Sequence, residues 1–491
     1  MPTNPRTPVL VGAAAVSQRT DDPWAALAPP ELMARALEVA AEDAGDRGLL
    51  SRADTIAVPR GMWEYGDPGR LVGRAVGADA AKSELYEIGV LQTTLLGEAA
   101  ARIAAGSADV VLIAGAEAKY REQQARRQGV SLPARGASET TPDRVIRPEG
   151  AILSPEEIGS ELAMPVGQYA MIENALRAAE GVSLTDHLRE VSELWSAMSD
   201  VAAANPRAWN RKSVSAEQVR SLADGNRMLA FPYTRLHNSQ WNVDQAAGLV
   251  LCSAATARSL GIPRERWVLP LSVADSNHML PLTQRGELHR SPGFAHAGAT
   301  ACEAAGCDPA GLAYLELYSC FPVAVRVQLR ELGLTPDRPL TVTGGMAFAG
   351  GPLNNFVLQA LVELVQRLRN DPGSVGLLTA VSGVLTKQGV SLWSTAPGPG
   401  AFRHADVSAA AAAEVREVRV AKDAPGRGRV NSYTVLYDGD VPARAVLLCD
   451  LEDGTRSLVV AHDPELAASL VEAEGCGRAV RIGADAGVAL D

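Results

Sequence analysis

The side chains of this sequence best suited to nucleophilic chemistry or soft-metal binding are six cysteines spread along the chain. They are Cys252, Cys302, Cys307, Cys320, Cys449 and Cys476. Zinc and iron–sulfur sites use closely spaced cysteine pairs, and disulfide-stapled domains pack many cysteines into a short chain. Neither pattern is present, so we expect no metal centre and no disulfide framework. The composition fits a reducing cytoplasm.

A cluster of glycines marks a second place where chemistry is conceivable. Gly344, Gly345, Gly350 and Gly351 crowd a turn just ahead of a predicted helix. Glycine allows positive φ angles and lets the backbone approach a partner closely. A tight turn explains the cluster, and a helix N-terminus that holds an anion or a carbonyl oxygen is compatible with it.

The elements that would position these residues follow an α/β pattern. Apolar runs of strand length alternate with long amphipathic segments, as expected for helices that cover a central sheet. The pattern occurs twice along the chain. Residues 88–106 (IGVLQTTLLGEAAARIAAG) align with residues 350–368 (GGPLNNFVLQALVELVQRL), and each is followed by an apolar strand. The sequence therefore predicts two tandem halves built on one plan.

Three further segments complete the predicted organisation. Arg, Pro, Ser and Glu dominate residues 126–240, which predicts an inserted cap. Residues 243–261 (VDQAAGLVLCSAATARSLG) have helical apolar spacing and would complete the first half. Pro, Gly and Ala in residues 394–413 indicate a linker, and short strands with Asp-Gly turns after it predict a small β-barrel or sandwich. The predicted units are residues 1–125, 126–240, 241–262, 263–405 and 406–491.

Bulk properties narrow the function classes. A net charge of −11 and a pI near 5.3 disfavour a nucleic-acid partner, because scattered basic residues cannot neutralise a run of phosphates. No apolar run reaches the roughly 20 residues that span a bilayer, so membrane insertion is not expected. The N-terminal apolar run continues into polar residues and is read as a first strand.

Several motifs resemble the thiolase superfamily, and within it the branch called thiolase-like protein type 1, near the sterol-carrier-protein thiolases. The matching segments occur in the expected order and cover nearly the whole chain: ADVVLIAGAEA, PVGQYAMIENALRAAEG, AANPRAW, FPYTRLHNSQWNVDQAAGLVLCS, LELYSCFPVAV, GGMAFAGGPLNNF and GRGRVNSYTVLYDG. The resemblance implies the thiolase fold, layered α-β-α-β-α, with an inserted cap. The last segment resembles the branch's additional C-terminal domain, expected as a small OB-like β-barrel.

The resemblance also implies that this chain lacks the side chains that catalyse the thiolase reaction. The reactive Cys of thiolases corresponds to Gly89, the activating His to Gly351, and the second Cys falls at or beside Val381. None of these side chains can be acylated or can carry a proton. The family's Asn-Glu-Ala-Phe loop reads Tyr318, Ser319, Cys320, Phe321. The branch often has a Lys-His pair after its last core strand, where this chain has Lys387 and Gln388.

Each remaining polar residue near the implied pocket can be interpreted as functional or as structural. Cys320 is a candidate reactive group or an inert buried thiol, and His237 is a candidate acid or base or a structural residue. Thr93 and Thr94 fit helix caps better than catalysis, and Lys387 could be a solvated charge. The pocket implied by the resemblance is formed by a small set of residues: Tyr318, Ser319, Phe321, Gly350, Gly351 and Asn354.

The implied function is that of an acyl-CoA-handling member of the acetyl-CoA acetyltransferase family without ordinary thiolase turnover. The alternative is a non-catalytic protein that binds CoA thioesters or acts as a scaffold. The expected ligand is CoA or an acyl-CoA as substrate, with no separate cofactor. A monomer or homodimer is expected, with a partner protein conceivable through the C-terminal domain.

Overall fold

The computed structural model describes residues 4–132, 140–223 and 225–491. Its first half is a six-stranded sheet with the order β1-β8-β4-β2-β3-β5. The strands are β1 (Pro8–Ser17), β2 (Thr55–Pro59), β3 (Lys82–Tyr86), β4 (Val110–Ala118), β5 (Arg144–Ile146) and β8 (Asp244–Ser253). Strand β8 lies antiparallel to both β1 and β4, whereas β4, β2, β3 and β5 run parallel.

The second half repeats this plan. Its five-stranded sheet has the order β10-β11-β12-β9-β13 and contains β9 (Leu269–Ser276), β10 (Tyr314–Glu316), β11 (Val375–Ser382), β12 (Lys387–Ser394) and β13 (Arg403–Asp406). Strand β12 is antiparallel to β9 and to β11, and β11 is parallel to β10. The series β9-β12-β11-β10 thus matches β1-β8-β4-β2 in order and direction, which confirms the internal repeat.

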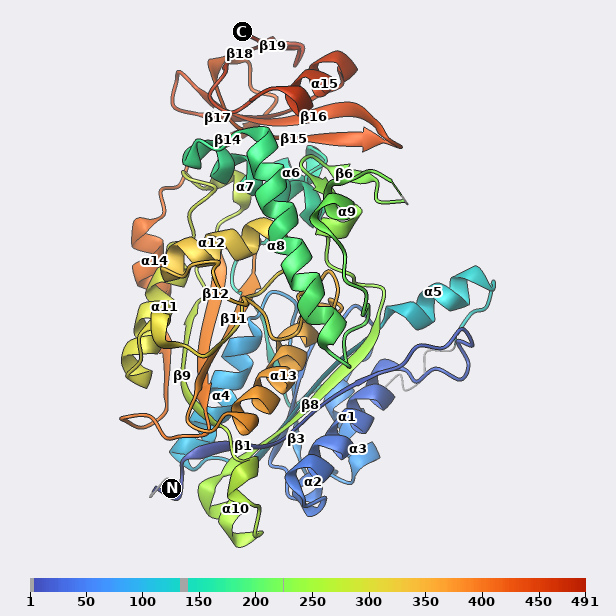
Figure 1. Cartoon of the computed structure of the whole chain (residues 1–491), viewed down its shortest axis with the longest axis vertical. Helices are drawn as coiled ribbons and strands as arrows, with labels where there is room; N and C mark the ends of the chain where they lie inside the picture. Colours follow the sequence, from blue (N-terminus) through green and yellow to red (C-terminus); the bar gives the residue numbers. More distant parts are fainter. Residues whose placement is uncertain (1–3, 133–139, 224) are drawn as a thin grey trace.

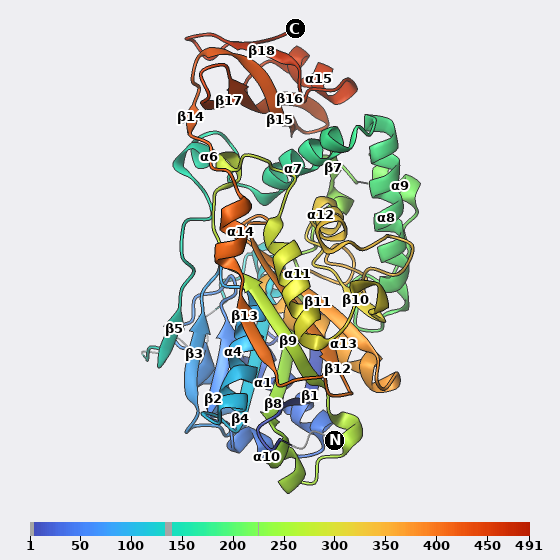
Figure 2. The ribbon, with the colours of Figure 1, turned by 90° about the vertical axis from the view of Figure 1, so that its left-hand side faces the viewer.

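Five layers result from the packing of helices on these sheets. The outer helices are α1 (Pro29–Ala44), α2 (Gly48–Ser51) and α3 (Pro68–Val76) on the first sheet, with α11 (Pro292–Ala305) and α12 (Pro322–Leu332) on the second. Helices α4 (Gln92–Ala105) and α13 (Phe356–Asn370) contact both sheets and form the central layer. Figure 2 shows α4 between the first sheet and β9. The thiolase fold is therefore present.

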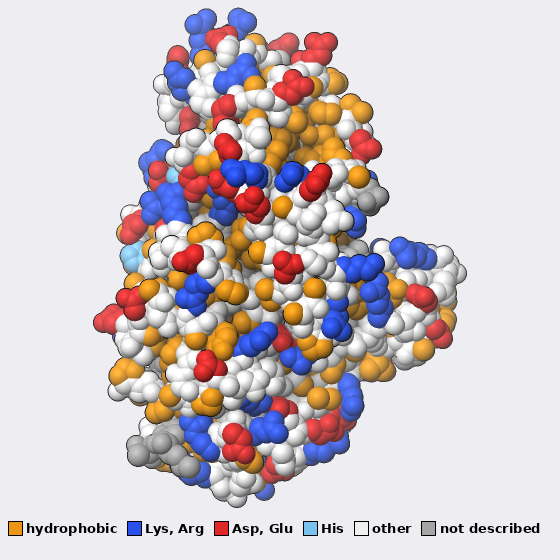
Figure 3. Space-filling view, viewed as in Figure 1, with side chains coloured by type: hydrophobic (Ala, Val, Ile, Leu, Met, Phe, Trp, Pro, Cys, Tyr) orange, Lys and Arg blue, Asp and Glu red, His pale blue; other side chains and the backbone are white. Residues whose placement is uncertain are grey.

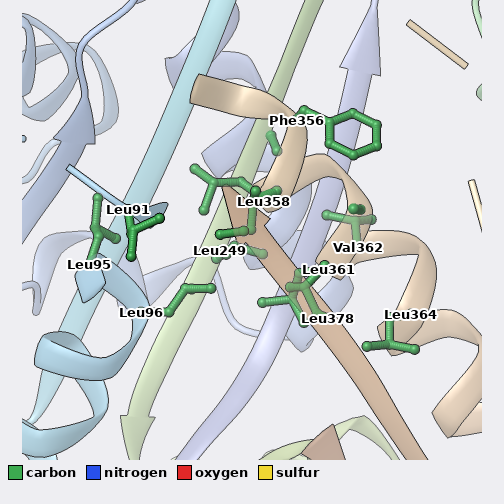
Figure 4. Close-up of a cluster of buried hydrophobic side chains, with 14 of the residues drawn as sticks. Leu91, Leu95, Leu96, Leu249, Phe356, Leu358, Leu361, Val362, Leu364 and Leu378 are labelled. Atoms are coloured by element: carbon green, nitrogen blue, oxygen red, sulfur yellow. The ribbon is translucent and has the colours of Figure 1, made fainter. Parts of the chain in front are cut away.

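The central layer holds the largest apolar core. Leucines of α4 and α13 meet leucines of both sheets (Figure 4), with the labelled set Leu91, Leu95, Leu96, Leu249, Phe356, Leu358, Leu361, Val362, Leu364 and Leu378. Helix α4 ends at Gly106, whose positive φ of 78° forms a left-handed cap. Alanines on α4 keep it thin enough to fit between two sheets.

One segment differs from its expected structure. Residues 244–253 form strand β8, not a helix, and only α10 (Ala254–Ser259) after it is helical. Every residue of β8 is buried because the strand lies between β1 and β4 with helices on both faces of the sheet. A strand buried on both faces is apolar throughout, so it lacks the alternation that separates strand from helix.

Most of the inserted segment lies between the core and the C-terminal domain, and its first helix projects to one side (Figure 1). It contains α5 (Lys119–Arg127), α6 (Pro155–Gly159), α7 (Pro165–Glu180), α8 (Leu184–Ala204), α9 (Ala216–Arg220), β6 (Met228–Ala230), β7 (Tyr233–Thr234) and the 3-10 turn η1 (Arg235–His237). Its strand β5 extends the first sheet at the edge of β3.

The C-terminal strands confirm a β-rich domain, which sits at one end of the molecule (Figure 1). It contains α14 (Ser408–Glu414), β14 (Val420–Lys422), β15 (Gly426–Asp438), β16 (Val441–Leu451), β17 (Arg456–Ala461), α15 (Pro464–Glu472), β18 (Ala479–Ile482) and β19 (Val488–Leu490). The sheet order is β14-β17-β16-β15-β18-β19, and β6 of the inserted segment pairs with β15. Within the described ranges no β14–β19 pairing closes this sheet into a barrel.

The expected linker is structured. Residues 403–406 form β13 at the edge of the second sheet, and residues 408–414 form α14, which packs against α11. The Ala-rich composition of this stretch suits a short helix as well as a linker, which is why composition alone misled.

The surface is mixed in charge. On the face shown in Figure 3, Lys and Arg side chains lie among Asp and Glu side chains over the core and the C-terminal domain. Across the three described ranges, no helix is both long enough and apolar enough to cross a membrane. The same residues contain no cluster of His, Cys, Asp and Glu that could hold a metal ion.

Candidate functional site

Gly89, which the resemblance sets at the position of the thiolase nucleophile, lies just ahead of α4 and is crowded. Gly89 has a φ of +102°, a region that L side chains rarely adopt. A Cβ built there would lie 2.8 Å from Cγ of Pro148, which comes from the inserted segment. A side chain at position 89 would therefore be strained and would require Pro148 to shift.

Gly351, which the resemblance sets at the position of the activating base, and its neighbour Gly350 are also crowded. A Cβ at Gly351 would collide with Oγ of Ser239, and one at Gly350 with the side-chain amide of Gln245. The Gly351 N–H donates to the carbonyl oxygen of Gln240 at 2.8 Å, so this group is already used within the protein. The glycine cluster acts here as a tight turn.

Asn354 of the implied pocket and Val381, set by the resemblance at the position of the second Cys, are engaged inside the protein. Asn354 donates to the Arg60 carbonyl oxygen at 2.7 Å and accepts from the amide of Gln92 at 2.9 Å. Val381 is buried in β11 and offers only hydrocarbon. These contacts tie the turn before α13 to the first turn of α4.

The loop that holds Cys320 is buried under aromatic rings. Phe321 stacks on Tyr169 with ring centroids 4.5 Å apart, and the Ser319 hydroxyl accepts a hydrogen bond from the Met346 N–H. Burial raises the pKa of the Cys320 thiol to about 12, so the thiol stays protonated at neutral pH. The ring of Tyr318 packs edge-on against Phe356.

His237 closes a turn inside the inserted segment. Its Nδ1 accepts the Thr234 backbone N–H at 3.1 Å, and the side chain is almost completely buried. Burial lowers the pKa of His237 to about 3, with a smaller contribution from His187. The described residues show no contact that joins His237 to Cys320. Neither lines a cavity described below, so the geometry gives no support to a catalytic pair.

A cavity of about 570 Å³ opens beside the start of α4. Val90, just ahead of α4, and Thr94 of α4 form one wall, and the start of β12 supplies Lys387. The other lining residues come from the inserted segment, the loop after β9, the end of β13, and α14: Ile146, Arg147, Pro148, Glu149, Gly150, Asn277, His278, Met279, Asp406, Ser408, Ala409 and Ala412.

Lys387 is the most unusual residue of this cavity. It is only 1% exposed, and its Nζ donates to the carbonyl oxygen of Gly89 at 2.9 Å. Burial lowers the pKa of Lys387, and the charge of Glu149 offsets part of this effect. The reading of Lys387 as a solvated charge is thus wrong, since the side chain points inward.

A network of polar side chains surrounds Thr94, which lines the cavity. Asp275, at the end of β9, accepts hydrogen bonds from the hydroxyls of Thr93 and Thr94 at 2.5 and 2.9 Å. The Nε2 of His404 lies 2.9 Å from the same carboxylate. Burial opposes charge on His404, but the hydrogen bond and charge of Asp275 raise its pKa overall. Thr93 and Thr94 therefore link α4 to β9, and the N-cap position belongs to Leu91.

The hairpin that presents Lys387 is strained. Val384 and Leu385 have φ angles of 53° and 68°, a region that costs energy for any residue with a Cβ and most for a β-branched one. Arg285 is fully buried and donates to the carbonyl oxygens of Gly383 and Val384 at 2.9 and 2.7 Å. The guanidinium therefore holds the hairpin in its strained form.

Arg456 of the C-terminal domain binds the backbone around Arg285. It is completely buried and donates to the carbonyl oxygens of Thr283, Arg285 and Gly286. Its Nε also donates to Asp450 at 2.6 Å. Through these hydrogen bonds the C-terminal domain holds in place the backbone segment that contains Arg285.

A second cavity of about 180 Å³ lies on the other side of His278 and α14. It is lined by the start of α11, by Arg290 and Arg416, and by Gln388. The two cavities share His278, and the wall between them includes α14.

Comparisons with known proteins place this geometry in a family. A family profile described as thiolase-like protein type 1 additional C-terminal domain matches residues 408–487. The crystal structure of a monomeric SCP2-thiolase-like protein type 1 from Mycobacterium smegmatis is 30% identical, with a TM-score of 0.82 over 99% of this chain and 100% of that one. A comparison with curated protein sequences finds no match.

Two more distant structures share the fold alone. The Ltp2–ChsH2(DUF35) aldolase is 20% identical, with a TM-score of 0.59 over 80% of this chain and 98% of that one. An acetyl-CoA acetyltransferase from Syntrophomonas wolfei is 19% identical, with a TM-score of 0.56 over 79% and 99%. The chain has the architecture of thiolases. It belongs to the thiolase-like protein type 1 family, whose additional C-terminal domain begins at α14.

Sequence reasoning did not single out Arg285 or Arg456, and it left the role of Lys387 open, with a solvated charge as one interpretation. One signal was available for Lys387, which is the only charged residue between Asp371 and Arg403. A single charge within an apolar run of strand length is costly to bury and therefore points to a role. Nothing in the sequence indicated that Arg456 reaches Arg285, since 171 positions separate them.

Proposed function

We propose that the protein binds CoA or an acyl-CoA in the cavity beside α4 and does not carry out the thiolase reaction. The single observation that carries the chemical part is the closure of position 89 by Pro148. Gly351 and Val381 leave the two proton-transfer roles empty as well. Without nucleophile and base, only positioning and oxyanion stabilisation remain.

The binding part is supported by position and by chemistry. The cavity lies at the start of the central helix, where the thiolase fold carries its reactive Cys. Arg147 and Lys387 supply positive charge to its wall, and Thr94 and Ser408 supply hydroxyls. Apolar groups such as Val90 and Met279 suit a pantetheine arm or a short acyl chain.

The alternative of a scaffold without a ligand predicts a different result in one experiment. Calorimetric titration with CoA and acetyl-CoA compares the protein with Ala412→Trp, which fills the cavity from α14. Ala410→Trp is the matched control, because Ala410 is exposed on the same short helix and lines neither cavity. We expect binding by the unaltered protein and the control, and none by Ala412→Trp. Absence of heat with the unaltered protein favours the scaffold.

A further inference from the structure

We propose that Lys387 binds the carbonyl oxygen of the ligand's thioester and so recognises the acyl end of the ligand. This proposal rests on the proposed function. The residue lies at the start of β12, lines the cavity and faces the first turn of α4.

The hydrogen bonds of Lys387 leave capacity for an acceptor. An ammonium group has three N–H donors, and the described residues provide Nζ with one partner, the Gly89 carbonyl oxygen. No carboxylate among those residues forms an ion pair with it. A buried donor without an acceptor is costly, and a carbonyl oxygen that enters the cavity supplies one.

The first turn of α4 favours the same kind of ligand atom. The helix is 14 residues long, and Leu91 at the N-cap position offers no side-chain acceptor. Free N–H groups and the positive end of the helix dipole therefore remain at the end that Val90 and Thr94 present to the cavity. Both features attract partial negative charge, and a thioester oxygen carries it.

The strained hairpin before β12 restricts the position of the Lys387 side chain. Val384 and Leu385 have unfavourable positive φ angles, and Arg285 donates hydrogen bonds to carbonyl oxygens of the same hairpin. Strain of this kind persists where the surroundings over-determine the backbone, and it is common at functional sites. Lys387 follows within three residues, so its ammonium is held against Gly89 and not left to sample solvent.

The test compares acetyl-CoA with S-ethyl-CoA, a thioether that keeps the nucleotide, the phosphates and the pantetheine but lacks the carbonyl oxygen. Calorimetry on the unaltered protein should show acetyl-CoA binding about tenfold more tightly, as expected for a hydrogen bond from a charged donor. Lys387→Met should abolish this preference and leave S-ethyl-CoA affinity within about twofold. Lys422→Met, at an exposed lysine of β14, should leave both affinities unchanged.

A second measurement needs no variant and so does not depend on folding of Lys387→Met. Infrared difference spectra of carbonyl-labelled acetyl-CoA on the unaltered protein should show a lower C=O stretching frequency than in water. Equal binding of the two ligands together with an unshifted stretch overturns the role of Lys387 and leaves CoA binding intact. Binding of neither ligand by the unaltered protein overturns the proposed function itself.

Discussion

The ammonium group of Lys387 lies 2.9 Å from the carbonyl oxygen of Gly89, which joins the second repeat to the first just ahead of α4. Pro148 covers the same glycine from the inserted segment. The expected effects of mutation follow from these contacts.

Gly89→Cys should not restore thiolase turnover. The new Cβ would meet Pro148 in a backbone conformation with φ of +102°, and we expect a loss of about 2–4 kcal/mol in the free energy of unfolding. Gly45→Cys is the matched control, because Gly45 also has a positive φ of +86° but has open space around it. Urea unfolding and acetoacetyl-CoA cleavage measure the two effects. Equal stability of the two variants would show that Pro148 yields easily.

Arg456→Met should weaken both the fold and the ligand site. It removes hydrogen bonds to three backbone carbonyl oxygens and leaves these acceptors buried, which we expect to cost about 3 kcal/mol or more. Acetyl-CoA affinity should fall as well, because Arg285 loses its support. Arg481→Met, at an exposed position of the same domain, should change neither quantity. Unaltered acetyl-CoA affinity in a folded Arg456→Met protein would show that Arg456 does not support the ligand site.

His237→Gln tests the structural role of His237 through its pH dependence. The folded protein keeps this side chain neutral down to about pH 3, whereas the unfolded chain takes up a proton near pH 6.5. Acidification below that value therefore favours unfolding of the natural protein, and Gln has no proton to bind. The stability advantage of His237 over Gln should shrink by about 2 kcal/mol between pH 7 and pH 5. A difference that does not change with pH in urea titrations would contradict the neutral, buried state.

The segment expected as a linker should resist proteases. Residues 403–406 pair with β9, α14 packs against α11, and Arg177 of α7 forms an ion pair with Glu474 of the C-terminal domain. We expect no cleavage within residues 403–414 under native conditions, and a chain that ends at Ala405 should be insoluble or unstable. Limited proteolysis with mass spectrometry checks this. An early cut there with two stable fragments would show an independent domain.

The sequence was sufficient for the parts of the fold that depend on local pattern. Alternating apolar runs identified the two α/β halves, and the alignment of residues 88–106 with 350–368 identified the paired central helices α4 and α13. Strand β8 was missed because it is buried on both faces and carries no alternation. Periodicity cannot distinguish such a strand from a buried helix.

The candidate site was less accessible to sequence reasoning. The assignment of Gly89, Gly351 and Val381 as the emptied catalytic positions stays a prediction. Cys320 and His237 gained no geometric support, because their burial depends on packing that no local pattern encodes. The contacts of Lys387 with Gly89 and of Arg456 with Arg285 span 298 and 171 positions. Such long-range hydrogen bonds arise only from the folded arrangement.

The central claim is that the protein binds CoA thioesters without thiolase turnover. The most direct measurement follows acetoacetyl-CoA cleavage by CoA, through the loss of enolate absorbance, beside calorimetric titration of CoA on the same preparation. We expect a heat of binding with cleavage at least about 10⁴-fold slower than in a thiolase that has all its catalytic groups. Turnover comparable to such a thiolase would contradict the account and make Cys320 and His237 the first residues to replace.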